Sequence, residues 1–302
     1  LLHTENTNVT PSIRQFIISY KDNTPRLKSI EIPSDKIIDV PSYSQYIRDK
    51  NIGGVICSPT SITMLLNRRN ENLIVEETAW SCFDYDYEAF GNWLFNVAFA
   101  SSLGYESFVE YGNLKSLKRE IYSGYPVAVS VKYTNDINNL EYPYIENAPI
   151  TTAGHILVVR GFEKKDGIDY VVVNDPAGKS NESVTRRYNL SEFESAWHRG
   201  SNIMYVIHDK EVEINNSRIE TSLELKNNKE NLYSVLVNDT YLDLSSDFVK
   251  TILITYDNGL TFEYLVPYNN HYLALENKNK CVIYIIGSDG FTYVCNCDEL
   301  SY

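Results

Sequence analysis

The pattern of the chain changes near residue 209, and this change constrains the fold more than any other feature. Before it, helical and strand-type patterns alternate, whereas after it short β-rich runs are separated by turn signals. A polar stretch rich in Asn, Glu and Lys, residues 209–231, joins the two parts. The length of 302 residues also exceeds what one compact core usually holds. We therefore expect an α+β domain over residues 36–208 and a smaller all-β domain over residues 212–302.

Periodicity predicts the elements of the α+β domain. Apolar residues at helical spacing predict helices at 59–67, 91–103 and 114–123, and a capping-box pattern predicts a last helix that opens at 191–194. Runs of Val, Ile and Tyr predict strands at 126–131, 155–162, 170–174 and 204–208. Residues 1–35 are predicted to be an N-terminal extension that carries a β-hairpin, with strands at 16–20 and 27–32.

The C-terminal part is predicted to contain strands at 233–237, 251–256, 261–265, 281–286 and 291–297. Asp257-Asn258-Gly259 predicts a tight hairpin, and residues 287–290 predict a second one. Five cysteines are too few for a disulfide scaffold, and none lies in the Cys-x-x-Cys spacing of zinc sites. Cys281 lies across the second hairpin from Cys295 and Cys297, where a disulfide can form in an oxidising compartment.

Charge and hydropathy exclude two classes of partner. The 40 acidic and 27 basic residues give a net charge of -13, which repels nucleic acid and anionic lipid surfaces. The apolar runs are far shorter than the ~20 residues that a membrane helix needs. The sequence therefore predicts neither a nucleic-acid partner nor a membrane span.

Cys57 is the strongest candidate for a reactive side chain. It directly precedes Ser58-Pro59, where a proline beside hydroxyl residues indicates the start of a helix. The positive end of a helix favours the thiolate, which is the nucleophilic form of cysteine. The alternative is that Cys57 is an inert buried thiol, because cysteine is among the most buried residue types.

A cysteine nucleophile needs a base, and His155 has the most suitable setting among the five histidines. It follows Gly154 and opens the apolar run of a buried strand, which places the imidazole at a strand end. His3 lies in the N-terminal tail and His271 in the β-rich part, while His198 and His208 end a helix and a strand.

Hairpin register gives the third member of the site. If the turn after the His155 strand centres between Lys165 and Asp166, paired positions sum to 331 and His155 faces position 176. A shift of one residue places it against Asp175, within reach of a carboxylate. Asn174 is the alternative orienting residue if the register slips. The remaining alternative is that 175–178 form only a turn.

Gln45 lies twelve positions before Cys57, and a side-chain amide near a nucleophile can donate to a developing oxyanion. A surface glutamine without any such role is the alternative.

The motif that begins at Cys57-Ser58-Pro59 resembles the bacterial papain-like cysteine peptidases, related to bacteriocin-leader-processing enzymes and known as cysteine peptidase family thirty-nine. The similarity continues in matching order through segments 84–86, 91–93, 124–127, 154–159 and 174–177. The resemblance implies a papain-like fold with Cys57 as nucleophile, His155 as general base, Asp175 as orienting residue and Gln45 in the oxyanion hole. It also implies hydrolysis of a peptide or protein substrate through an acyl-enzyme, with no metal or organic cofactor.

The chain departs from the leader-processing branch. Those enzymes usually have Gly after the nucleophile and are fused to transporters, whereas Ser58 follows Cys57 here, so leader processing is not expected. The resemblance and the start at Leu1 indicate a processed bacterial protein, secreted or at the cell surface. Two alternatives stay open. One is a cell-wall peptide amidase or transferase with the same triad. The other is a non-catalytic surface protein whose all-β domain binds a cell-wall or surface glycan.

Overall fold

The computed structural model describes residues 17–19, 35–214, 223–229, 231–275 and 280–297. It confirms the predicted fold class, an α+β region followed by an all-β region. The predicted N-terminal hairpin lies outside the described residues except for 17–19, which are in no strand. No helix within the described ranges is both long and apolar enough to cross a membrane.

The first region is built from one seven-stranded sheet and five α-helices. The helices are α1 Cys57–Asn67, α2 Val75–Ser81, α3 Trp93–Ser102, α4 Leu114–Ser123 and α5 Leu190–Arg199, with 3-10 turns η1 Gln45–Ile47 and η2 Asn181–Ser183. The strands are β1 Lys36–Ile37, β2 Tyr105–Tyr111, β3 Val127–Tyr133, β4 Thr152–Lys165, β5 Ile168–Asn174, β6 Thr185–Asn189 and β7 Ile203–Lys210. They pair antiparallel in the order β2-β7-β3-β4-β5-β6, and β1 pairs with β4.

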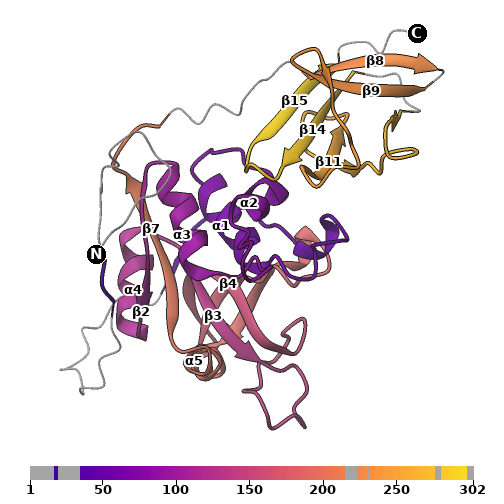
Figure 1. The fold of residues 1–302 in the computed structure, drawn as a ribbon. Helices are drawn as coiled ribbons and strands as arrows, with labels where there is room; N and C mark the ends of the chain where they lie inside the picture. The colour runs from indigo at the N-terminus through magenta and orange to yellow at the C-terminus, as the bar shows by residue number, and fades with distance from the viewer. Residues whose placement is uncertain (1–16, 20–34, 215–222, 230, 276–279, 298–302) are drawn as a thin grey trace.

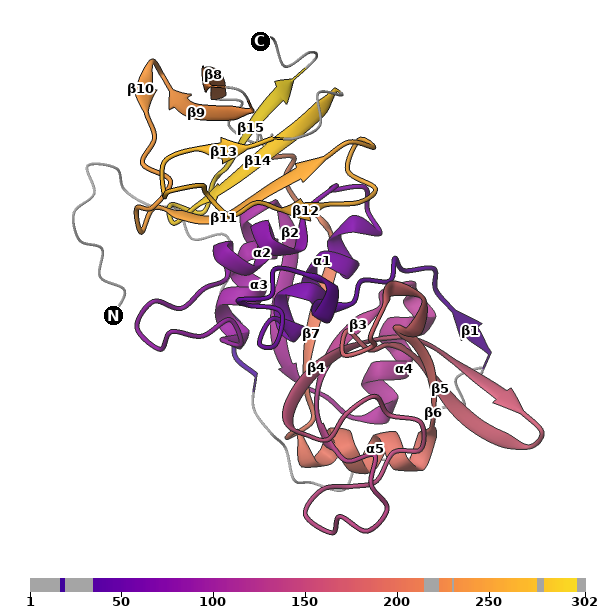
Figure 2. The ribbon, with the colours of Figure 1, turned by 90° about the vertical axis from the view of Figure 1, so that its right-hand side faces the viewer.

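The second region comprises residues 223–297 and is here called the C-terminal module. It contains two four-stranded sheets. Its strands are β8 Leu223–Lys229, β9 Leu232–Val237, β10 Thr240–Tyr241, β11 Val249–Thr255, β12 Glu263–Tyr264, β13 Leu273–Ala274, β14 Cys281–Gly287 and β15 Thr292–Cys297. The first sheet joins β8, β9, β10 and β13, and the second has the order β12-β11-β14-β15. Figures 1 and 2 show that α1, α2 and α3 lie between this module and strands β3 and β4.

The core of the first region forms where α1 packs on β3 and β4, α3 on β2 and β7, and α5 on β3, β5 and β6. Leu66 of α1, Leu117 of α4 and Trp197 of α5 are all at most 1% exposed in this core. Helices therefore pack on the seven-stranded sheet, and β4 lies in its interior between β3 and β5.

Several predicted element boundaries are wrong. The last helix begins at Leu190, because the Asn189 side chain accepts from the N–H of Ser191, so the cap is Asn189 and not a box at 191–194. Helix α2 and strands β2 and β6 were not predicted. The seven residues of α2 are too few to establish a helical period, and β6 carries two arginines in five residues.

The hairpin between β4 and β5 has a different register from the predicted one. Its turn is Asp166-Gly167, with Lys165 paired to Ile168, so paired positions sum to 333 rather than 331. Both turn residues have positive φ, 51° and 82°, as a two-residue turn that matches the strand twist requires. A bulge between Val159 and Gly161 then lowers the sum to 332, where Val158 pairs with Asn174.

Of the two hairpins predicted in the C-terminal module, the second is confirmed by pairing of Ile286 with Thr292. The first is wider than predicted, because Leu253 pairs with Tyr264. Asp257 closes that wider loop by accepting from the N–H and hydroxyl of Thr261. Cys281 pairs directly with Cys297, yet both are free thiols, as is Cys295, so the disulfide is not formed in this structure.

The C-terminal module is packed against α2. Ile74, Leu253 and Ile286 form a buried apolar cluster across the boundary, with Trp80 and Tyr264 packed around it. The module is thus attached through a shared core as well as through the chain connection.

Shortening a side chain between α1 and the sheet should destabilise the first region selectively. We expect Leu66→Ala to lower the free energy of unfolding by about 2–5 kcal/mol, because it leaves a cavity in a fully buried site. Leu140→Ala is the matched control: Leu140 is 95% exposed, so its loss should change stability by less than about 0.5 kcal/mol. Urea unfolding followed by tryptophan fluorescence measures both, since Trp80, Trp93 and Trp197 all lie in the first region. Equal losses in the two variants would contradict this packing.

Candidate active site

Cys57 is the first residue of α1, as the sequence predicted. The residue before it, Ile56, makes no capping bond through its side chain, so no side chain covers the first N–H groups of the helix from that position. The backbone N–H groups of Ser58 and Ile156 donate to the Cys57 sulfur instead. A helix start without a side-chain cap thus becomes a place that stabilises negative charge on sulfur.

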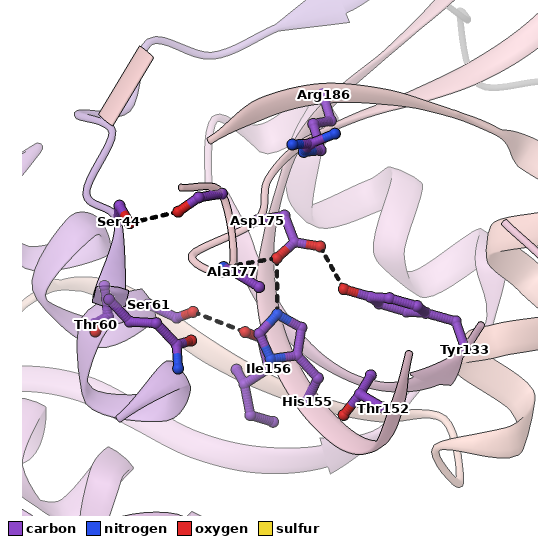
Figure 3. A network of polar contacts seen from close by, with 12 residues as sticks. Ser44, Thr60, Ser61, Tyr133, Thr152, His155, Ile156, Asp175, Ala177 and Arg186 are labelled. Carbon is purple, nitrogen blue, oxygen red and sulfur yellow. Dashed lines mark hydrogen bonds and ion pairs between the residues drawn. The ribbon is translucent and has the colours of Figure 1, made fainter. Parts of the chain in front are cut away.

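Small hydroxyl side chains fasten α1 to the sheet next to Cys57. Ser61 Oγ donates to the carbonyl oxygen of Ile156 at 3.3 Å (Figure 3). Ser58 Oγ lies 3.0 Å from the hydroxyl of Tyr205 on β7. Both serines are fully buried, so these bonds satisfy polar groups that would otherwise be costly inside the core. The contacts fix the helix start relative to the strand that carries His155.

His155 lies near the start of β4, opposite Val131 of β3, and it is 4% exposed. Its Nε2 is 2.8 Å from Oδ1 of Asp175, and its imidazole also hydrogen-bonds the Cys57 side chain. Because Nε2 is engaged by the carboxylate, Nδ1 is the ring nitrogen left for the sulfur. The ring therefore connects Cys57 to Asp175, which are 118 positions apart in the sequence (175 − 57).

Asp175 directly follows the last residue of β5 and is fully buried. Its Oδ1 accepts from His155 and from the N–H of Ala177 at 2.9 Å, while its Oδ2 accepts from the hydroxyls of Tyr133 and Tyr188, each at 2.8 Å. Figure 3 shows Tyr133 approaching the carboxylate from the side opposite Ala177. Residues 175–178 do form a turn, with the N–H of Gly178 bonded to the Asp175 carbonyl, and the carboxylate also bonds His155.

The charges of the three groups support one another. Burial raises the pKa of the Cys57 thiol, but the charge of His155 and the hydrogen bonds to the sulfur leave it below its usual value. Burial lowers the pKa of His155, yet the charges of Asp175 and Cys57 raise it by more. Burial likewise raises the pKa of Asp175, and its bonds to His155 and Tyr133 bring it below normal. Each shift favours the charged form of its group: the thiolate of Cys57, the imidazolium of His155 and the carboxylate of Asp175.

Tyr133 and Tyr188 were not singled out from the sequence, although both are fully buried against Asp175. The 24 tyrosines of the chain gave no reason to prefer these two. One signal was available for Tyr133: it lies two positions after Val131, the partner of His155, so it shares a face with that residue. The predicted strand ended at Val131, two residues too early to include it.

Gln45 is buried in η1, and its position is tied to the Asp175 turn by its backbone N–H, which donates to the Pro176 carbonyl at 2.9 Å. Its side-chain Nε2 donates to the carbonyl of Gly53 at 2.9 Å. An amide nitrogen carries two hydrogens, so this bond uses one of them. Gln45 is thus brought next to the Asp175 turn, with one amide hydrogen not used by Gly53.

Asn174, the alternative orienting residue, does not face His155. Its amide donates to the carbonyl of Pro41 at 3.0 Å and its Oδ1 accepts from Thr185 at 2.9 Å, so both ends are used on the other side of β5. Of the other described histidines, His208 bonds Glu106 and Glu120 and His198 bonds Asn202. The structure therefore brings together Cys57, His155 and Asp175.

Comparison with known proteins finds similar solved structures and one matching family. Among solved structures, a putative C39-like peptidase from Bacillus anthracis is 18% identical, with 59% of this chain and 100% of that chain covered and a TM-score of 0.42. A double glycine motif protease from an AMS/PCAT transporter, in complex with the leader peptide, is 18% identical, with 57% and 93% covered and a TM-score of 0.32. Procathepsin L 3 of the Tenebrio molitor larval midgut is 14% identical, with 60% and 71% covered and a TM-score of 0.41. Curated protein sequences give no match.

The assignment rests on the family comparison rather than on these remote structural similarities. The family described as "Peptidase_C39 like family" matches residues 37–204, which is 168 of the 302 residues (204 − 37 + 1) and so more than half of the chain. The match includes Gln45, Cys57, His155 and Asp175. The chain therefore belongs to the Peptidase C39-like family and is a cysteine peptidase.

Proposed function

We propose that the chain hydrolyses peptide bonds with Cys57 as nucleophile, His155 as general acid and base, and Asp175 as orienting residue. The observation that supports this most directly is that one imidazole hydrogen-bonds the Cys57 sulfur on one side and the Asp175 carboxylate on the other. This is the relation that nucleophile, base and orienting group need for acyl transfer.

In the first half-reaction, the Cys57 thiolate attacks the carbonyl carbon of the substrate amide. The carbonyl π electrons move to oxygen, and the tetrahedral intermediate carries that negative charge. His155 then gives its proton to the departing amine as the C–N bond breaks, which leaves a thioester on Cys57. Asp175 holds the imidazole with one nitrogen toward the sulfur throughout, and its charge stabilises the imidazolium before transfer.

In the second half-reaction, neutral His155 takes a proton from water as the water oxygen attacks the thioester carbonyl. The intermediate collapses with loss of the Cys57 thiolate, and the carboxylic acid product leaves. The site returns to the thiolate–imidazolium pair with which it began. Every proton moved in the cycle passes through His155.

Gln45 is proposed to stabilise the oxyanion together with the backbone N–H of Cys57. Two features support it: η1 is bonded to the Asp175 turn, and Gly53 takes only one of the two amide hydrogens. The Cys57 N–H belongs to the first helical turn, whose N–H groups have no acceptor within the helix. Two such donors are the usual requirement for an oxyanion hole.

Membership of the family supports a peptide substrate. The acyl group and the acceptor that enter the site determine which bond is cleaved. They also determine whether the chain acts instead as an amidase or a transferase. A glycan partner of the C-terminal module and a secreted or cell-surface location in bacteria stay predictions from the sequence.

The activated thiol can be tested without knowing a substrate. Because its pKa is lowered, Cys57 should react with iodoacetamide well below the ~8.5 at which a free thiol ionises, and labelling should fall only as the pH drops through the lowered value. In His155→Ala the rate should shift toward an ordinary thiol profile, while His198→Ala, at an exposed histidine bonded to Asn202, should leave it unchanged. Peptide mapping by mass spectrometry separates Cys57 from the four buried cysteines. A profile that His155→Ala leaves unaltered would rule out the pair.

The oxyanion role predicts a different signature. Gln45→Ala should lower kcat by about 10²–10³, because one donor to the developing oxyanion is lost. Its iodoacetamide profile should stay that of the parent chain, since alkylation of sulfur forms no oxyanion. Hydrolysis of a quenched-fluorescence peptide mixture, measured beside alkylation, makes the comparison. If both rates fell together, Gln45 would act on the structure of the site rather than on the oxyanion.

The two tyrosines should act together on Asp175. Tyr133→Phe or Tyr188→Phe leaves Oδ2 with one donor, and each should cost about 1–2 kcal/mol of unfolding free energy. The double variant leaves Oδ2 with none and should cost more than the sum of the single losses. Tyr122→Phe, at an exposed site, is the control.

The same variants have a defined pH dependence. The folded pKa of Asp175 is lowered, so its stabilisation is present above the unfolded value of ~3.9 and is lost as pH falls through the folded value. Removal of both donors raises the folded pKa, so the double variant should lose less stability on acidification than the parent. Urea unfolding at several pH values between neutral and acidic measures this, and strictly additive, pH-independent losses would contradict it.

A further inference from the structure

The segment that follows Gln45, here called the 46–51 loop, is held from two sides. On the site side, Gln45 is bonded to Pro176, next to Asp175. On the other side, Asp49 Oδ2 accepts from the hydroxyl of Thr251 in the C-terminal module at 2.9 Å. Asp49 is buried, so this contact between the two regions is shielded from water. The loop therefore links the candidate active site directly to the module.

Two residues of α2, Glu76 and Trp80, reinforce this link. Glu76 Oε1 accepts from the N–H of Asp49 at 3.1 Å and from the hydroxyl of Tyr264 at 2.6 Å, which places one carboxylate between loop and module. The indole N–H of Trp80 donates to Thr251 at 3.2 Å. With the apolar cluster on α2, these bonds fix the module in one position against the 46–51 loop.

A pocket of about 590 Å³ lies between the 46–51 loop and the module. The volume falls within the range typical of ligand sites. Residues from β11, from the 263–267 segment and from Leu244 form the module's wall, and the loop forms the opposite wall. Apolar side chains from both walls line it: Ile47, Leu244, Ile252, Leu265, Val266 and Pro267. Neither region forms this pocket alone.

The pocket begins one residue from the proposed oxyanion donor. Tyr46 lines it and belongs to the same 3-10 turn as Gln45. The pKa of the Tyr46 hydroxyl is raised by partial burial and by the charges of Asp175 and Cys57, as expected for a group beside the reacting residues. Tyr46 and Ile47 are each 45% exposed and line the pocket at the end of the loop that is next to Gln45.

We propose that this pocket is a subsite that binds an apolar side chain of the peptide substrate, several residues from the scissile bond. This inference rests on the proposed function, because it assumes a peptide held across Cys57. An extended chain that passes from Cys57 along the 46–51 loop would reach this pocket. Charged side chains also line the pocket: Arg48, Asp49, Lys50, Lys250 and Glu263. Asp49 is bonded to Thr251, Arg48 donates to the carbonyl of Ser44, and Lys250 lies over the ring of Trp80. Because these three charges are already engaged, we assign recognition of the side chain to the apolar walls. The C-terminal module thereby becomes part of the specificity of the peptidase.

The test uses peptides that alkylate Cys57, so no natural substrate is needed. One series carries a chloroacetyl group on the N-terminus of peptides of increasing length, and the other carries a chloromethyl ketone on the C-terminus. The peptides of the two series extend from Cys57 in opposite chain directions. We expect the second-order rate, divided by that of iodoacetamide, to rise about tenfold in one series when a leucine replaces glycine at the position that reaches the pocket.

Val266 allows the pocket to be changed without disturbing the core, because it is 76% exposed. Val266→Trp, which fills the pocket, and Val266→Asp, which places a charge on its wall, should both remove the leucine effect and leave the iodoacetamide rate unchanged. The matched controls are Thr240→Trp and Thr240→Asp, at an exposed position of the same module that does not line this pocket. They should retain the leucine effect in full.

The outcomes separate the two hypotheses. A leucine effect that survives both Val266 variants, or that is missing from both peptide series, would overturn the subsite. Slow labelling by iodoacetamide, with the profile of an ordinary thiol in the parent chain, would instead overturn the proposed function itself.

Discussion

A charged carboxylate without access to water is stable inside a protein only when every oxygen has donors, and Asp175 is such a group. Its four donors come from neighbouring parts of one sheet. Tyr133 ends β3, His155 lies on β4, Ala177 follows β5, and Tyr188 lies on β6. Four adjacent strands thus have to keep their register for one charge to remain solvated by protein. The orientation of the imidazole, and with it the state of the Cys57 thiol, depends on that arrangement.

Helix α1 packs on this sheet with several buried hydroxyl side chains, which is unusual for a helix in a core. Its buried side chains include four hydroxyl groups, of Ser58, Thr60, Ser61 and Thr63. Thr60 and Thr63 bond carbonyl groups four residues earlier in the chain, while Ser58 and Ser61 bond the sheet. Because these side chains are short, the helix can lie close to β4 without leaving polar groups unsatisfied. The start of the helix is then near enough for sulfur and imidazole to interact.

The sequence was sufficient to predict that Cys57, His155 and Asp175 meet, and insufficient to predict how they meet. Proline after Cys57 predicts the helix start, and the apolar run after His155 predicts the buried strand. The contact between His155 and Asp175 was predicted from a register that is wrong by two positions at the turn. The prediction reached the right residue because the bulge after Val159 removes one position of that error, and because Asp175 lies beyond the paired strand, where its side chain is free to turn toward the ring.

Other features depended on contacts that a linear pattern does not contain. The amide hydrogen of Ile156, which bonds the sulfur, belongs to a backbone group whose direction is set by the sheet. Tyr133 and Tyr188 are distinguished from the other tyrosines only by what they face. Helix α2 is short, and part of its packing comes from the C-terminal module, which lies far away in the sequence. Such elements are determined by tertiary contacts, so local propensity is a weak guide to them.

The packing of the module on α2 also bears on the order of events when the chain is made. The ribosome releases the catalytic region first, and the strands that cover Ile74 and Trp80 follow later, since their partners Leu253 and Ile286 lie in β11 and β14. Until those strands have folded, the apolar face of α2 is exposed to water and the 46–51 loop lacks the bond from Thr251 to Asp49, although Pro176 and Glu76 already hold it. A newly made chain therefore completes the pocket beside the 46–51 loop last, after Cys57, His155 and Asp175 have been made.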